Sequence, residues 1–278
     1  MNTSPHPVNA SVTDMYRNMP SLDVITPQLQ TELQIRSEEI EKIILEHNLV
    51  DESKELFLKL APELALNKLV NAVSPVFTGK ELDLNLVESR AKELNLAYSK
   101  STGFVGISVK LVDPEFKCKY TAIFFRSGSV NCVGLSSDAP EYLAQCTALL
   151  KKYCGLIFGN DFSEQLQMAR KITNRVYTIH LKDYKIQLQQ LKKLNRWRDC
   201  KYVNEAFPGA IIDFPNNPAT KKSKLLLFNT GKLIFTGIKN HLTKFEVERE
   251  LLKFFGDIVA YKMNNPASEI ITYKATAK

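Results

Sequence analysis

Residues 124–134 read FFRSGSVNCVG and residues 227–237 read LFNTGKLIFTG. Each stretch contains an apolar run, a short polar turn with a glycine and a second apolar run, which is the pattern of a β-hairpin. When the chain is aligned with itself at an offset of 103 residues, the two hairpins superpose without a gap. The matched pairs are Phe104 and Phe207, Gly106 and Gly209, Phe125 and Phe228, Gly128 and Gly231, and Gly134 and Gly237. Glycines shared by two copies indicate the same backbone turns, so the sequence predicts a duplicated unit folded about a pseudo-dyad.

The composition is typical of a globular intracellular protein. The 278 residues suffice for one large domain or two ordinary ones. No apolar stretch is long enough to span a bilayer, and the N-terminus lacks the layout of a signal peptide, so neither a membrane span nor secretion is expected. An odd number of cysteines without a CxxC pair favours reduced thiols over disulfides or a zinc site. The five cysteines are Cys118, Cys132, Cys146, Cys154 and Cys200.

Charge is distributed unevenly along the chain. Residues 1–65 contain five basic and eleven acidic residues, whereas the remainder has a net charge of +13 within a total of +7. A basic body with an acidic N-terminal arm indicates a polyanionic partner, with nucleic acid as the first candidate. The alternative is charge that serves only solubility.

Hydrophobic periodicity predicts an N-terminal helical arm followed by two series of strands and helices. Helices are expected at residues 28–46, 51–60, 82–94, 139–158, 184–197 and 244–255, and strands at 68–73, 104–112, 120–125, 129–134, 176–181, 209–214, 224–228 and 232–237. Asp83 or Asn85 is expected to cap the third helix, and Ser137 or Asp138 the fourth. The predicted divisions are an acidic extension over 1–64, partly disordered and helical at about 28–60, repeat 1 over 65–158, a linker over 159–175, repeat 2 over 176–265 and a tail over 266–278.

The predicted hairpin strands are apolar on both faces. In residues 120–125, Ile123 and Phe125 point to one face, while Ala122 and Phe124 point to the other. One alternative is a sheet that is covered on both sides. Each repeat supplies helices for only one face, however, so we expect the second apolar face to be a binding surface. The minor groove of DNA suits such a face, because apolar contacts and flanking lysines can bind it together.

From about residue 66 to residue 260 the chain resembles the TATA-box-binding protein family. ELDLNLVESRA is similar to the family's KLDL helix segment, and IFFRSGSVNCVG and LLFNTGKLIFTGIK are similar to its two hairpins. YVNEAFPGAII is similar to its stirrup segment with the FPG motif. The resemblance implies an α+β fold, a two-repeat pseudo-symmetric saddle with a concave antiparallel sheet and convex helices, here with an N-terminal helical extension.

The resemblance also implies residue roles. The intercalating phenylalanines would be Phe104, Phe125, Phe207 and Phe228. The groove floor would contain Asn71, Ile123, Asn131, Val133, Thr178, Leu226, Ile234 and Thr236, and the phosphate contacts Lys110, Lys222, Lys232 and Lys239. Glu205 matches an acidic contact to a transcription-factor-IIB-like partner, while Val203 replaces the other.

Several positions depart from the family pattern. Asn131 stands where valine is usual, Ser129 replaces a lysine and Asp213 replaces an arginine. For the second of the family's two central asparagines, the second repeat offers Thr178 or Tyr177 and no asparagine. These departures put strict TATA recognition in question, and loss of positive charge at residue 213 is expected to weaken binding in that half.

The implied function is that of a transcription initiation factor that binds and bends AT-rich promoter DNA through the minor groove and recruits initiation factors and RNA polymerase. The alternative is a protein of the same fold that has lost TATA specificity and serves as a protein-interaction or architectural DNA-packaging component. No catalytic constellation, metal site or cofactor motif is present, so no enzyme activity is expected. The expected location is the nucleus, or a viral factory or virion for a viral protein.

The acidic arm has no counterpart in the family's core. One hypothesis is that it mimics DNA and covers the basic concave face until it is displaced. The other is that it docks a partner or serves solubility.

Overall fold

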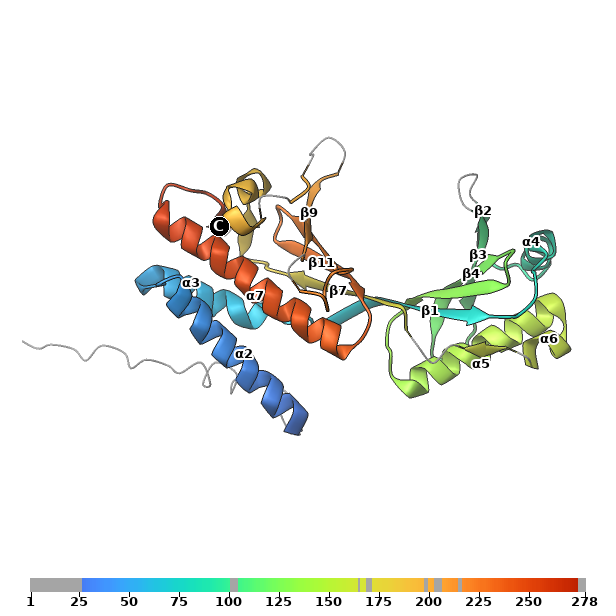
Figure 1. The fold of residues 1–278 in the computed structure, drawn as a ribbon. Helices are drawn as coiled ribbons and strands as arrows, with labels where there is room; N and C mark the ends of the chain where they lie inside the picture. Colours follow the sequence, from blue (N-terminus) through green and yellow to red (C-terminus); the bar gives the residue numbers. More distant parts are fainter. Residues whose placement is uncertain are drawn as a thin grey trace, which may run out of the picture. The chain divides into compact units, whose positions relative to one another are not determined.

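The computed structural model describes residues 27–100, 105–164, 166–168, 172–197, 200–202, 207–214 and 217–274 (Figure 1). The chain forms two compact units. Unit 1 comprises Met1–Leu66, Ile179–Ile234 and Lys244–Lys278, and unit 2 comprises Asn67–Thr178 and Phe235–Thr243. The N-terminal helices therefore belong to the same unit as the C-terminal helix, although they lie at opposite ends of the sequence.

The large antiparallel sheet has the strand order β2-β3-β4-β5-β1-β7-β11-β10-β9, with β6 paired to β1. The strands are β1 (Lys68–Phe77), β2 (Tyr98–Lys100), β3 (Gly106–Val112), β4 (Lys119–Phe125), β5 (Ser129–Leu135), β6 (Gln167–Met168), β7 (Asn174–His180), β9 (Gly209–Asp213), β10 (Lys224–Phe228) and β11 (Lys232–Ile238). The order β3-β4-β5-β1 recurs in reverse as β7-β11-β10-β9. This repetition confirms the predicted duplication, and the α+β class of the fold is confirmed with it.

The two hairpin turns have the same geometry. Gly128 and Gly231 have φ values of 83° and 78°, a region that side chains rarely adopt. A Cβ atom at Gly128 would lie 2.1 Å from the carbonyl oxygen of Lys80, and one at Gly231 would lie 2.4 Å from that of Leu181. Each turn therefore requires glycine both for its backbone conformation and for the close approach of the backbone that follows β1 or β7.

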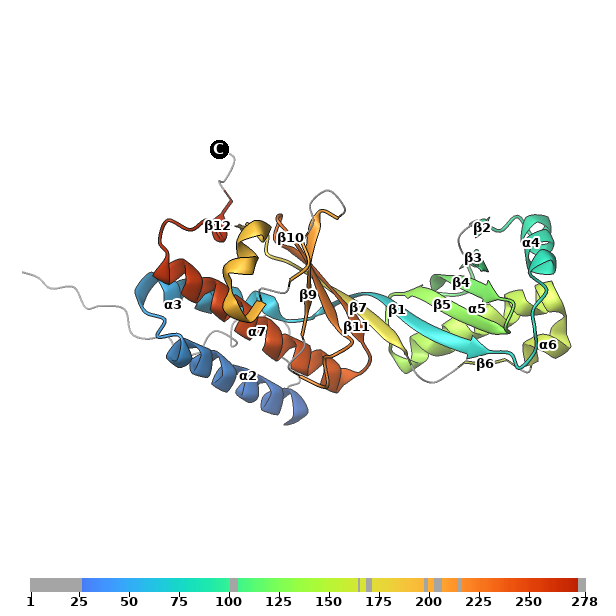
Figure 2. The same ribbon diagram turned by 45° about the horizontal axis from the view of Figure 1, so that its top comes forward.

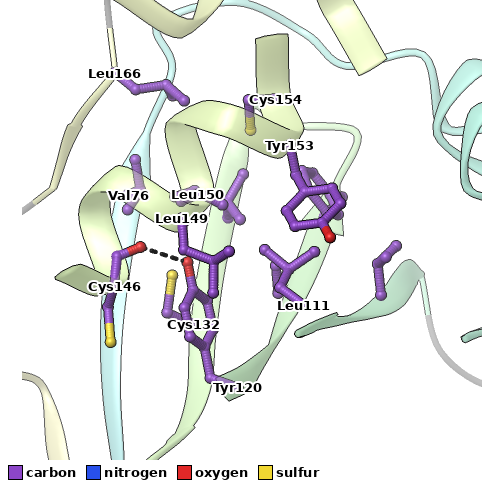
Figure 3. Close-up of a cluster of buried hydrophobic side chains, with 14 of the residues drawn as sticks. Val76, Leu111, Tyr120, Cys132, Cys146, Leu149, Leu150, Tyr153, Cys154 and Leu166 are labelled. Atoms are coloured by element: carbon purple, nitrogen blue, oxygen red, sulfur yellow. Dashed lines mark hydrogen bonds between the residues drawn. The ribbon is translucent and has the colours of Figure 1, made fainter. Parts of the chain in front are cut away.

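Unit 2 has its core between its strands and helix α5 (Pro140–Phe158), with α4 (Leu84–Glu93) and α6 (Asn160–Glu164) beside it (Figure 2). Figure 3 shows the centre of this cluster, where the Tyr120 hydroxyl donates to the carbonyl oxygen of Cys146 at 2.7 Å. All five cysteines are buried, and none of them forms a disulfide. Burial raises the pKa of the Cys132 and Cys154 thiols to about 12, so these thiols stay protonated at neutral pH.

Unit 1 contains the long helix α7 (His241–Asn264) from Lys244 onward, and a second, two-stranded sheet of β8 (Tyr184–Ile186) and β12 (Ile271–Tyr273). Trp197 contacts both α7 and Phe214, the residue that follows β9. Its ring packs edge-on against Phe254 of α7 at 5.1 Å between centroids and against Phe214 at 6.1 Å, and its indole N–H donates to Asp257 at 2.6 Å.

The N-terminal helices α2 (Pro27–Glu46) and α3 (Asp51–Leu60), with the 3₁₀ turn η1 (Ala61–Leu64), pack against α7 (Figures 1 and 2). The Glu39 carboxylate lies 2.8 Å from Nη2 of Arg249 and 3.7 Å from Nζ of Lys253. Nε2 of His47 lies 3.2 Å from the carboxylate of Asp257, and the backbone N–H of Leu66 donates to Glu248 at 2.6 Å. Apolar side chains of the arm are buried as well, namely Ile40, Ile43, Leu49, Phe57, Leu60 and Leu64.

Within unit 1, this packing contradicts the hypothesis that the arm covers the basic sheet face, as far as residues 27–64 are concerned. Glu39 of α2 binds Arg249 and Lys253 of α7 instead, because α2 presents this residue and its apolar stripe to the same helix. Residues 1–26 lie outside the described part of the chain.

Some local predictions need correction. Residues 184–197 were expected to form one helix, but they form β8 and the 3₁₀ turns η2 (Leu188–Lys193) and η3 (Asn195–Trp197), because Tyr184–Ile186 pairs with β12. Helix α4 is capped by Asp83, which accepts from the N–H of Asn85 at 2.9 Å, as predicted. Helix α5 has Ala139 at its N-cap position and no side-chain cap, since Asp138 instead pairs with Arg175 at 2.7 Å.

Candidate nucleic-acid interface

Burial alternates along the hairpin strands of each repeat. In β4, Ala122 and Phe124 are buried, while Ile123 and Phe125 are half-buried. In β10, Leu225 and Leu227 are buried, while Leu226 and Phe228 are half-buried. The half-buried residues share one face of the sheet, because side chains alternate along a strand. Each repeat therefore has one face in the core and one apolar face that remains accessible to solvent.

The predicted groove-floor residues lie on this accessible face. Within unit 2, Asn131 pairs with Ile123, and Val133 pairs with Thr121. In the second repeat, Leu226 pairs with Ile211 of β9. All the predicted floor residues are half-buried, namely Asn71, Ile123, Asn131, Val133, Thr178, Leu226, Ile234 and Thr236.

Phe207 and Phe228 form a pair at the outer end of the second repeat. Their ring centroids are 5.7 Å apart, with 62° between the ring planes. Gly209 lies opposite Phe228 in the ladder, and a Cβ atom there would lie 2.8 Å from Cε1 of Phe207 and 3.1 Å from Cε1 of Phe228. The glycine is therefore required for the two rings to meet. In the first repeat Gly106 lies opposite Phe125 in the same way, whereas Phe104 lies outside the described residues.

Two asparagines occupy equivalent positions in the inner strands. The side-chain oxygen of Asn71 accepts from the N–H of Gly134 at 2.7 Å. That of Asn174 accepts from the N–H of Gly237, also at 2.7 Å. The register places Val73 opposite Asn174 and Asn71 opposite Val176, as a pseudo-dyad between the two strands requires.

Asn174 corrects the expectation that the second repeat lacks this asparagine. The signal was already in the sequence, because Asn71 and Asn174 are separated by the same 103 residues as the hairpin glycines. Thr178, which was predicted for this role, lies on the same face four residues further along β7. The Asn174 amide also donates to Oγ1 of Thr236 at 3.3 Å, which fixes its orientation.

The lysines at the predicted phosphate positions are exposed, namely Lys110, Lys222, Lys232 and Lys239. Lys119, exposed at the start of β4, is the repeat-1 counterpart of Lys222 at the same offset and was missed by the sequence reasoning. Asp213, the counterpart of Lys110, forms an ion pair with Lys224 on β10 at 2.5 Å. Repeat 1 has its lysine on β3 (Lys110) and a threonine, Thr121, on β4. Repeat 2 instead has its lysine, Lys224, on β10, next to the strand that carries Asp213. Glu205, the predicted partner contact, lies outside the described residues.

Comparison with known proteins identifies the family. The family model "Transcription factor TFIID (or TATA-binding protein, TBP)" matches residues 67–153 and 169–268. The chain belongs to the TATA-binding protein family. This is a family of DNA-binding transcription factors rather than enzymes. Within the described residues, no group of three His, Cys, Asp or Glu side chains could hold a metal ion, and none of the helices described there is long and apolar enough to cross a bilayer.

Individual relatives match between 62% and 70% of this chain. The "TATA-box-binding protein" of Tetrahymena thermophila is 30% identical over 195 residues, which is 70% of each chain. That of Methanococcus aeolicus is 30% identical over 175 residues, 62% of this chain and 84% of the relative. The "TBP-related factor" of Drosophila melanogaster is 29% identical over 173 residues, 62% of this chain and 69% of the relative. Among solved structures, "Methanococcus jannaschii TBP" aligns at 24% identity with a TM-score of 0.45, covering 67% of this chain and 96% of the other.

Proposed function

We propose that the protein is a transcription initiation factor that binds promoter DNA through the minor groove, bends it and recruits further initiation factors and RNA polymerase. The observation that carries the proposal is the accessible apolar sheet face, which recurs in both repeats with a phenylalanine at its outer end and an asparagine at its inner end. The chain's family membership supports the same class of function.

The phenylalanines supply the bending. Phe125 and Phe228 each end a β-strand, and Gly209 holds the Phe207 and Phe228 rings together. Apolar side chains that enter a base step partly unstack it and kink the duplex, which widens the minor groove for contact with the sheet. A paired set of rings at each repeat would place one kink at each end of the site.

The asparagines supply base contacts. In each case the side-chain oxygen is occupied by a glycine N–H, so the amide group is oriented to donate. The floor of the minor groove at A·T pairs presents only acceptors, A N3 and T O2. Two donors near the pseudo-dyad therefore favour A·T pairs at the centre of the site, where the amino group of a G·C pair would oppose them.

The presence of Asn174 weakens the alternative function, a protein of this fold that has lost TATA specificity. That alternative rested in part on the lack of a second asparagine. Ser129, Asn131 and Asp213 still favour it, since they replace a cation or an apolar floor residue. We therefore propose relaxed promoter recognition rather than its loss, with a nuclear location, or a viral factory or virion if the chain is viral.

Partner recruitment rests on the family alone. Glu205 is proposed to contact a transcription-factor-IIB-like protein, and the helices of each unit to contact the polymerase machinery. In unit 1 the partner surface includes α2 and α3, because these helices cover part of α7.

The test measures binding and bending of an AT-rich and a GC-rich duplex by fluorescence anisotropy and by energy transfer between the duplex ends. The wild type is expected to bind and bend the AT-rich duplex, and the double variant Phe125→Ala/Phe228→Ala to bind it more weakly without bending. Equal, weak and unbent binding by both proteins would refute the proposal.

A further inference from the structure

A large aromatic side chain that the proposed function does not use is exposed on the accessible face. Phe77 is the last residue of β1, and 67% of its surface is exposed. Along β1, Ala72, Ser74 and Val76 are buried, so Phe77 points to the same face as Asn71 and the hairpin residues of unit 2. Phe77 therefore extends the accessible apolar face of unit 2 to this end of β1, and a contiguous exposed apolar face is typical of an interaction site.

Phe77 lies in a row with Phe125 across neighbouring strands. Gly106 of β3 lies opposite Phe125 of β4, and Phe77 of β1 lies opposite Ser129 of β5. Ser129 follows the turn that begins at Phe125, where the Gly128 N–H donates to the Phe125 carbonyl at 3.0 Å. With a strand spacing of about 4.8 Å, the two phenylalanines are about 10 Å apart, which matches roughly three nucleotides of one DNA strand at about 3.4 Å each.

The backbone beside Phe77 is held tightly. The Thr78 N–H donates to the Gly128 carbonyl at 2.9 Å, and the Thr78 hydroxyl lies 2.9 Å from the carbonyl oxygens of both Gly128 and Lys80. The strand end and the hairpin turn therefore form one unit, and a ligand contact by Phe77 requires little ordering of the chain.

The surroundings of Phe77 suit a polyanion. Lys80 and Arg126 are both exposed beside the turn, and neither forms an ion pair within the described residues. Glu81 is the exposed acidic residue of the same loop. An exposed ring at a strand end whose adjoining loop and turn carry two exposed cations fits the sugar and phosphate edge of a duplex, in which apolar deoxyribose alternates with negative charge.

The second repeat has different residues at the equivalent positions. The Leu181 N–H donates to the Gly231 carbonyl at 2.9 Å, as that of Thr78 does to Gly128. By the 103-residue offset His180 is the counterpart of Phe77, and Lys232 is the counterpart of Ser129. Both His180 and Lys232 are exposed.

We infer that Phe77 is a fifth aromatic contact to the bound duplex. Phe77 binds deoxyribose through apolar contact beside the intercalating Phe125, whereas at the equivalent strand end of the second repeat Lys232 binds phosphate beside Phe228. This inference rests on the proposed DNA-binding function. It implies that the two repeats contribute unequally to the salt dependence of binding.

The test uses the full chain and an AT-rich duplex, with dissociation constants measured by anisotropy at several salt concentrations. Phe77→Ala and Phe77→Thr, the second of which keeps the preference for a strand, are expected to weaken binding roughly tenfold without changing the salt slope. Ser129→Lys is expected to make the slope of log K against log salt steeper by about one, and Lys232→Ser to make it shallower by about one. His180→Ala is the matched control and is expected to change the affinity less than about twofold.

Two outcomes separate this inference from the function on which it rests. Wild-type affinity of both Phe77 variants, beside a weakened Phe125→Ala/Phe228→Ala variant, would overturn the fifth contact and leave the proposed function intact. Wild-type affinity of the Phe125→Ala/Phe228→Ala variant would overturn the proposed function itself. Because Phe77 is exposed, its variants are expected to keep the melting temperature of the wild type.

Discussion

Gly256 provides a test of the packing between the N-terminal arm and α7 in which the sign of the effect is decisive. It is a buried residue within α7, and a Cβ atom there would lie 2.5 Å from Cγ2 of Ile43 on α2. Two ring atoms of His47 would lie 3.6 and 3.7 Å away, at ordinary contact distance. The substitution Gly256→Ala therefore places one methyl group against one named atom of the arm.

Two effects of opposite sign determine the magnitude. In a helix without neighbours, replacing glycine by alanine stabilises by about 0.8–1 kcal/mol. Carbon atoms pack at about 3.5–4.0 Å, so the new methyl group lies at least about 1 Å too close to Ile43. Overpacking of this kind costs about 1–3 kcal/mol. We therefore expect Gly256→Ala to lower the free energy of unfolding by about 1 kcal/mol. If α2 did not pack against α7, the same substitution would raise it.

The double variant Ile43→Ala/Gly256→Ala isolates the contact. Ile43→Ala alone removes a buried side chain and is expected to cost about 2–5 kcal/mol. In the double variant the new methyl group occupies part of the vacated volume, so the loss is expected to be smaller than the sum of the single losses by at least about 1 kcal/mol. Gly155→Ala in α5 is the matched control. Its new methyl group would lie 3.1 Å from the movable side chain of Asn160, so we expect no loss of stability.

The assay is urea unfolding followed by tryptophan fluorescence. Trp197 is the single tryptophan of the chain, and it packs on Phe254 and binds Asp257, the neighbour of Gly256. The signal therefore reports on unit 1, and the Gly155→Ala control in unit 2 is followed by far-UV circular dichroism. A higher unfolding midpoint for Gly256→Ala, together with additive losses in the double variant, would refute the packing of α2 on α7.

Other predictions concern charge and DNA contact. Burial opposes ionisation of Glu39, but the hydrogen bond from Arg249 and the charges of Lys253 and Arg249 hold its pKa below the ordinary value. Its carboxylate thus stabilises the fold above the ordinary pKa of 4.5, and the stabilisation is lost as the pH falls through the lowered value. The Glu39→Gln variant is expected to have a free energy of unfolding about 1–3 kcal/mol below that of the wild type at neutral pH. This difference is expected to become smaller in acid, where the wild type loses its carboxylate, as measured by urea unfolding across the pH range. Asn71→Asp and Asn174→Asp keep the oxygen that accepts from the glycine N–H but remove the amide donor. Each variant should therefore bind an AT-rich duplex at least about tenfold more weakly. Clearly unequal losses of affinity would contradict the equivalence of the two asparagines. Asp213→Asn releases Lys224 for phosphate contact, and anisotropy should show an affinity gain of about threefold with a steeper salt slope, whereas an unchanged slope would exclude Lys224 from the interface.

Local sequence patterns predicted the hairpins because their causes are local. A turn that requires positive φ selects glycine, and a half-buried strand selects alternating side chains, so both features can be recognised in the sequence. Gly128 and Gly231 have positive φ, and the strands beside them alternate. Asn174 was equally predictable, since it follows Asn71 at the offset of the hairpins. Phenylalanine and glycine alone do not reveal it, because the repeated asparagine marks neither a turn nor an apolar strand.

Other features depend on contacts that are distant in sequence. Residues 184–186 adopt a strand because residues 271–273 pair with them, and this partner outweighs their helical periodicity. The position of the arm is determined by ion pairs such as that between Glu39 and Arg249, 210 residues apart. No pattern within 28–64 identifies α7 as the partner.

The distance between Glu39 and Arg249 along the chain has a consequence for biosynthesis. Helix α2 leaves the ribosome well before α7, and elongation at about 5–20 residues per second separates them by roughly 10–40 s. During that interval the apolar stripe of α2, with Ile40 and Ile43, has no covering helix, although unit 2 can already fold from its nearly continuous segment, Asn67–Thr178. Because transiently exposed apolar surface is what chaperones protect, we expect the nascent arm to bind them until α7 is complete, and a chain truncated before α7 to keep this stripe uncovered.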